Sequence, residues 1–99
     1  MDGLLKGDVV RIISPEEYRE LGGTCSDDCA IAYYADSICT VNIVHNYGYT
    51  LTPITTVRNF PLEVNPTIEP IEYYTWNNRA VELYEEPLSN PNDGFIDVF

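Results

Sequence analysis

The chain has 99 residues and a formal net charge of −11, because 16 Asp and Glu residues face only five Lys and Arg residues. The length predicts a single domain. Five cations are too few for a protein that binds nucleic acid by neutralising phosphates, and an anionic membrane surface would repel the chain. A hydrophobic content of 44% and an aromatic content of 12% argue against a disordered chain.

A first strand is predicted over Val9–Ile13, directly before a strong helix start. Ser14 can accept a hydrogen bond from the Glu17 backbone while the Glu17 side chain reaches back to Ser14, which is the capping-box arrangement. Pro15 suits the first helical position, where its missing N–H group costs nothing. The glycine pair at 22–23 is expected to end this helix after about two turns.

A second short helix is predicted over residues 29–35. Ser26 is placed to cap it, and Asp27 and Asp28 would lie in its first turn. Both acidic side chains would then face the positive end of the helix dipole.

The clearest strand covers residues 38–44, which are uncharged and rich in β-branched side chains. Strand alternation predicts that Cys39, Val41 and Ile43 share one face. A turn then leads into a returning strand over residues 49–57, so that the two strands form a hairpin.

Three prolines between residues 60 and 70 predict an extended excursion rather than regular structure. Strands are expected again over 71–76 and 79–84. Residues 1–84 therefore form the predicted domain, with the helices as an insertion, and residues 85–99 form a C-terminal extension. We expect a mainly β (α+β) fold.

The sequence from Gly7 to Ser14, the acidic helix start at Pro15, the uncharged strand over 38–44 and the segment from Tyr74 to Leu83 together resemble a known pattern. The pattern is that of small SH3-like barrel proteins of bacteriophages and mobile elements, and the resemblance covers about residues 6–84. It implies a small antiparallel SH3-like barrel and a phage source, and it carries no catalytic residue. The long segment over 49–70 and the C-terminal extension depart from the pattern.

Cys25, Cys29, Cys39 and His45 are the candidate metal ligands. Their spacing is poor for zinc, because Cys39 and His45 would lie about 20 Å apart along one strand. The same separation argues against a Cys–His nucleophile, and no pair of carboxylates stands out for glycoside chemistry. We therefore expect no metal, no cofactor and no enzymatic activity, with the cysteines as small apolar core residues.

No signal peptide is visible after Met1, and residues 37–57 are too interrupted by polar residues to span a membrane. An odd number of cysteines argues against a complete disulfide framework. The expected location is the reducing host cytoplasm. A Cys25–Cys29 disulfide is the alternative for an exported chain.

Eight acidic residues precede residue 37 and eight follow residue 59, with none between. If the two acidic blocks lay on one face, they would mimic the charge of DNA and compete for a basic channel. The leading hypothesis is a phage-type, anti-CRISPR-like inhibitor of a host nucleic-acid-binding defence protein, such as an effector nuclease. The alternatives are a structural or accessory phage barrel and an SH3-like peptide-binding module. The predicted partner-binding residues are Glu16, Glu17, Glu20, Asp27 and Asp28 as the acidic face, with Tyr47, Tyr49, Tyr73 and Tyr74 as aromatic anchors.

Overall fold

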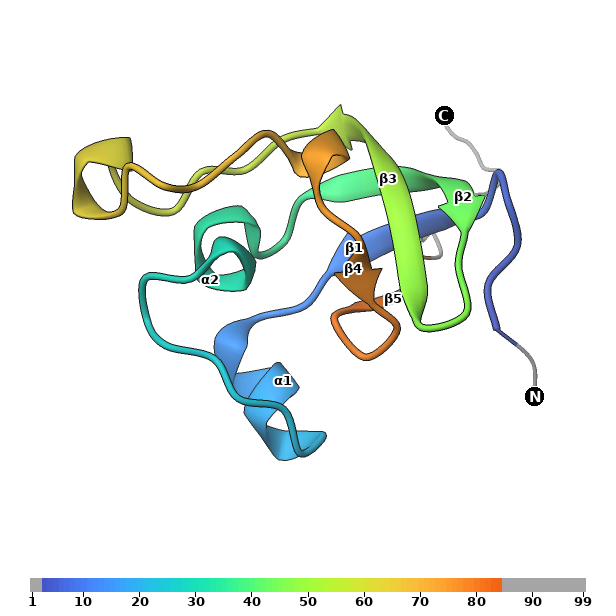
Figure 1. Ribbon diagram of the computed structural model, residues 1–99, viewed down its shortest axis with the longest axis horizontal. Helices are drawn as coiled ribbons and strands as arrows, with labels where there is room; N and C mark the ends of the chain where they lie inside the picture. The colour runs from blue at the N-terminus through green and yellow to red at the C-terminus, as the bar shows by residue number, and fades with distance from the viewer. Residues whose placement is uncertain (1–2, 85–99) are drawn as a thin grey trace, which may run out of the picture.

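The computed structural model describes residues 3–84, which form a five-stranded antiparallel sheet with two short α-helices (Figure 1). The strands are β1 (Val9–Ile12), β2 (Ile38–Val44), β3 (Gly48–Thr55), β4 (Trp76–Asn77) and β5 (Val81–Leu83), in the spatial order β4-β3-β2-β1-β5. The helices are α1 (Pro15–Glu20) and α2 (Ala30–Tyr34), with 3₁₀ turns η1 (Leu62–Val64) and η2 (Ile71–Tyr73). The predicted mainly β (α+β) architecture is confirmed. The predicted extension over 85–99 lies outside the described residues.

The predicted capping box at the start of α1 is confirmed. The Glu17 backbone N–H donates to Ser14 Oγ at 3.1 Å, and the Ser14 backbone N–H donates to Glu17 Oε1 at 2.9 Å. Pro15 occupies the first turn as expected. The helix ends where Gly22 adopts a φ of +92°, a left-handed conformation that glycine reaches without steric cost.

Strands β2 and β3 form the predicted hairpin, but their pairing contains two register shifts, between Ile38 and Cys39 and between Val41 and Ile43. An extra residue in one strand reverses the alternation of the side chains that follow it. The prediction that Ile43 shares a face with Cys39 and Val41 is therefore wrong: Cys39 and Val41 are buried, whereas Ile43 is 48% exposed.

The core lies on one face of the sheet. It is built by side chains from all five strands and is covered by α2 and η2. Trp76 is buried, its ring centroid lies 6.2 Å from that of Tyr34 on α2, and its indole N–H donates to the Ile71 carbonyl at 3.0 Å. The fully buried strand residues of this core are Val10, Ile12, Cys39, Val41 and Leu51.

The strand predicted over 71–76 is wrong over most of its length. Residues 71–73 form η2, and only Trp76 and Asn77 pair with β3. The Tyr73 N–H donates to the Pro70 carbonyl at 3.0 Å, which closes a tight turn in place of a strand.

The proline-rich excursion predicted over residues 60–70 lies in a long arm that begins earlier, at residue 56, because β3 ends at Thr55; η1 is at its far end, on the left of Figure 1. The base of the arm is tied to the end of α2. Asn59 Nδ2 donates to the carbonyls of Ala32, Tyr33 and Ala35, each at 3.1 Å. These contacts satisfy carbonyls that the short helix leaves without a partner.

Candidate functional site

Three carboxylates from three separate parts of the chain converge on the guanidinium of Arg11 in β1 (the Arg11 cluster). Glu17 of α1 and Asp36 in the turn after α2 lie 2.9 Å and 2.6 Å from the nearest guanidinium nitrogen. Glu82 of β5 lies 2.7 Å away. Glu82 belongs to the second acidic block and the other two carboxylates to the first, so the two acidic blocks meet at Arg11.

The pairing of β1 with β5 brings this cluster together, since Arg11 and Glu82 are direct partners in the ladder. Partial burial alone would lower the pKa of Arg11, but the hydrogen bonds to its three carboxylates outweigh burial and raise the pKa above its ordinary value. The hydrogen bond from the Ser14 backbone lowers the pKa of Glu17 most, and Arg11 lowers it further. Both groups therefore stay charged at neutral pH.

The acidic surface extends beyond the Arg11 cluster along α1. Glu20 lines a shallow pocket of about 220 Å³ together with Glu17, Glu82 and Arg79. Glu16 is exposed and stands one helical turn before Glu20, so the two lie on the same side of the helix. We define the acidic surface as Glu16, Glu17, Glu20, Asp36 and Glu82. With Arg11 and Arg79 as its cations, this surface carries three uncompensated negative charges.

The other two predicted acids lie in the loop that joins α1 to α2. Asp27 forms an ion pair with Arg19 at 2.8 Å, and Asp28 accepts a hydrogen bond from the Ser26 hydroxyl at 2.8 Å. A disulfide joins Cys25 to Cys29 across this loop, which is the alternative pairing that the sequence left open. The charge of Asp27 is thus matched locally, whereas Glu16 and Glu20 form no ion pair with any described residue.

The four predicted aromatic anchors lie in different environments. Tyr47 and Tyr73 are 65% and 72% exposed. Tyr49 is a buried core residue whose hydroxyl accepts a hydrogen bond from the Leu4 N–H. Tyr74 is half-buried against Trp76, and its hydroxyl accepts from the Glu69 N–H at 2.7 Å. Only Tyr47 and Tyr73 therefore present most of their rings to a partner.

An open groove of about 260 Å³ runs between α1, α2 and β4. Tyr18, Ile31, Tyr74 and Trp76 supply its large apolar side chains. This groove was not predicted from the sequence. Its aromatic residues are spread over nearly 60 positions, and only the Tyr73–Trp76 aromatic run gave a local signal.

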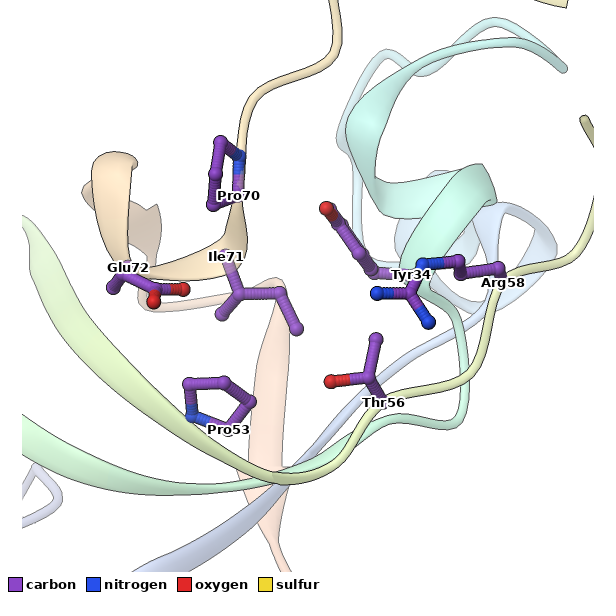
Figure 2. A pocket seen from close by; sticks show the side chains of 7 residues that line it. All are labelled: Tyr34, Pro53, Thr56, Arg58, Pro70, Ile71 and Glu72. Carbon is purple, nitrogen blue, oxygen red and sulfur yellow. The ribbon is translucent and has the colours of Figure 1, made fainter. Parts of the chain in front are cut away.

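A second pocket, of about 210 Å³, lies where the end of β3 passes α2 and η2 (Figure 2). Tyr34 and Ile71 are its buried residues, and Arg58 and Glu72 lie on opposite sides of it. Neither charged residue has a sequence pattern that marks it as part of a pocket.

The candidate metal ligands do not come together. Residues 3–84 contain no group of three or more His, Cys, Asp or Glu side chains arranged to hold a metal ion. Cys39 is fully buried, and burial is the main cause that raises the pKa of its thiol to about 11. His45 Nε2 forms a hydrogen bond with the Thr50 hydroxyl at 2.8 Å.

Within the described part of the chain, no helix combines the length and the apolar character needed to cross a bilayer. No protein family model matches the sequence, and no curated protein or solved structure matches it either.

Proposed function

We propose that this protein is a small non-catalytic inhibitor that occupies the basic nucleic-acid-binding channel of a host protein. The observation that carries the proposal is the meeting of the two acidic blocks at Arg11. Clustered carboxylates steer a protein towards a basic channel far better than the same charges spread evenly over its surface. A defence nuclease of the host is the partner class that fits a phage-type protein.

The rigidity of the acidic surface supports this function. The Arg11 guanidinium binds three carboxylates. One of them, Glu17, also closes the capping box, so that its side chain joins the start of α1 to β1. Fixed charges lose little conformational entropy when they bind. The exposed ring of Tyr47 would add an apolar contact, as tyrosine does at many protein interfaces.

The proposal includes a sheet curled into a small SH3-like barrel of phage type. One observation supports curling: the β2–β3 ladder contains two register shifts. Bulges bend a strand and increase its twist, which is how small sheets close on themselves.

The test is affinity capture of proteins from nuclease-treated bacterial lysate on the immobilised full chain, followed by elution with duplex DNA. DNA should release the captured proteins. Salt at 0.5 M should prevent capture, because the Debye length falls from about 10 Å at 0.1 M to about 4 Å at 0.5 M. Glu16→Gln/Glu20→Gln should weaken binding about fivefold or more.

The matched control is Glu63→Gln/Glu69→Gln, which also removes two negative charges, but from the arm instead of from α1. The control should bind as the unaltered chain does. Retained proteins that DNA fails to displace, or equal losses in both double variants, would show that the acidic surface is not a nucleic-acid mimic.

The aromatic groove supports a second candidate function, the SH3-like peptide-binding module. Proline-rich peptides bind to grooves lined by aromatic side chains, and Tyr18, Tyr74 and Trp76 line this one. Because the chain contains a single tryptophan, its fluorescence reports directly on the groove. A saturable change on titration with a proline-rich peptide, lost in Tyr18→Leu, would favour this function over the inhibitor.

A further inference from the structure

The pocket shown in Figure 2 suggests a ligand of a different kind, independently of the proposed function. It lies between the end of β3, α2 and η2 and shares no lining residue with the acidic surface or the aromatic groove. At about 210 Å³ it is smaller than most ligand pockets, which measure about 300–1,000 Å³. Its size alone therefore selects a small molecule.

The base of the pocket is apolar and rigid. Ile71 is 2% exposed and Tyr34 is 6% exposed. The Tyr34 hydroxyl donates to the Glu69 carbonyl at 3.0 Å, which ties α2 to the segment that enters η2. Pro53 and Pro70 form the adjacent walls, and their fixed φ angles limit the movement of the backbone there. The pocket is therefore formed before any ligand arrives.

The rim carries two opposite charges that do not neutralise each other. Arg58 and Glu72 are both exposed, and they form no ion pair with each other or with another described residue. Figure 2 shows the Glu72 carboxylate on one side of the pocket and the Arg58 guanidinium on the other, with the Ile71 side chain between them.

Both charges act on the same buried phenol. Burial is the main cause that raises the pKa of Tyr34; of the two rim charges, Arg58 lowers this pKa and Glu72 raises it. An anion alone would leave Glu72 facing it without a partner, and a cation alone would leave Arg58 in the same position. A molecule with one charge of each sign satisfies both.

We propose that this pocket binds a small zwitterion with an apolar body, of the class of a free α-amino acid with an aliphatic side chain. The ligand carboxylate would accept hydrogen bonds from the Arg58 guanidinium, a pairing that is often bidentate. Its ammonium group would donate to the Glu72 carboxylate, and its side chain would pack on Ile71 between the two prolines. Since both ion pairs are at the rim, we expect a Kd of about 1 mM.

The first experiment is a titration of the ¹⁵N-labelled full chain, followed by backbone amide shifts, with L-leucine, N-acetyl-leucine and leucinamide. The two derivatives keep the apolar body, but each lacks one charge. Leucine should cause saturable shifts around Arg58 and Glu72 and bind at least about fivefold more tightly than either derivative, which corresponds to one lost rim ion pair.

The second experiment assigns each charge to its rim residue. Arg58→Gln should bind leucine and leucinamide equally, because the carboxylate has lost its partner. Glu72→Gln should bind leucine and N-acetyl-leucine equally, for the corresponding reason. Arg79→Gln and Glu63→Gln make the same charge changes away from the pocket and should leave the Kd for leucine unchanged.

Three results would overturn the proposal. One is the absence of saturable shifts up to about 50 mM leucine, which is far above the expected Kd. The second is a Kd for leucine no lower than that of its derivatives. The third is a loss of leucine binding in the two distant control variants equal to that in the two rim variants, since this would show that binding depends only on net charge.

Discussion

Replacing Arg11 with methionine tests whether the Arg11 cluster stabilises the fold as well as organising the acidic surface. Methionine keeps much of the apolar stem but removes the guanidinium, so that Glu17, Asp36 and Glu82 face one another without a cation. The Arg11 side chain is 20% exposed, whereas its partners are 44%, 65% and 51% exposed. The cluster therefore lies between the surface and the interior.

The magnitude follows from this intermediate burial. An exposed ion pair contributes at most about 1 kcal/mol, whereas breaking a buried one costs about 3–5 kcal/mol. Three half-exposed contacts to one guanidinium, with the repulsion left behind, give an expected loss of about 2 kcal/mol in the free energy of unfolding. Urea denaturation at pH 7 measures this loss directly.

The pH dependence gives a second readout with a definite sign. The folded-state pKa of Glu17 lies below its ordinary value of 4.5. This carboxylate therefore stabilises the fold above pH 4.5, and that contribution is lost as the pH falls through the lowered pKa. Arg11→Met removes the part of this stabilisation that Arg11 contributes. In the variant, protonation of the carboxylates at low pH also relieves the repulsion among them. The difference in stability between the two proteins should then shrink as the pH falls from 5 to 3.

The control is Arg58→Met, which makes the same change in net charge at an exposed arginine that forms no ion pair with a described residue. Its stability should fall by less than about 0.5 kcal/mol. Equal losses in the two variants, or a difference that stays constant down to pH 3, would refute the assignment of this stabilisation to the Arg11 cluster.

Four further outcomes are expected. Gly48→Ala should lower the free energy of unfolding by about 2–3 kcal/mol in urea, because a Cβ atom there overlaps the Trp76 carbonyl and separates β4 from β3. Asn59→Ala should cost about 1–2 kcal/mol and speed amide exchange in the arm, since the carbonyls at the end of α2 lose their side-chain donor. Reduction of the Cys25–Cys29 disulfide, which spans four residues, should lower stability by about 2 kcal/mol. Cys39, with its raised pKa and full burial, should react with a thiol reagent at pH 8 only in urea; rapid labelling in native buffer would contradict its burial.

The sequence predicted those parts of the fold whose signals are local. The Ser14–Glu17 capping box needs only four consecutive residues, and β2 is an uninterrupted run of suitable side chains. The bulge that turns Ile43 outwards has no such signal, because it depends on how β2 is paired with β3. The strand predicted over 71–76 failed because the turn after Pro70 and the burial of the Trp76 indole compete with extended structure.

The sequence identified several residues of the candidate site, but it did not predict how the chain brings them together. Glu16, Glu17 and Glu20 were singled out correctly as neighbours on one short helix. Asp36 and Glu82 were not singled out as partners of Arg11, since the ladder that aligns Arg11 with Glu82 joins residues 71 positions apart. Tyr49 did carry a usable signal: it alternates in phase with Leu51, and both are buried.

The position of β1 in the sheet also constrains how the chain folds. One side of β1 pairs with β2, about 30 residues later, but its other side pairs with β5, about 70 residues later. During synthesis at the ribosome, that second edge therefore stays open until residue 83 has emerged, when nearly the whole domain has been made. Closing so long a loop is slow. We expect folding to end with the docking of β5, so the Arg11 cluster forms only when the sheet is complete.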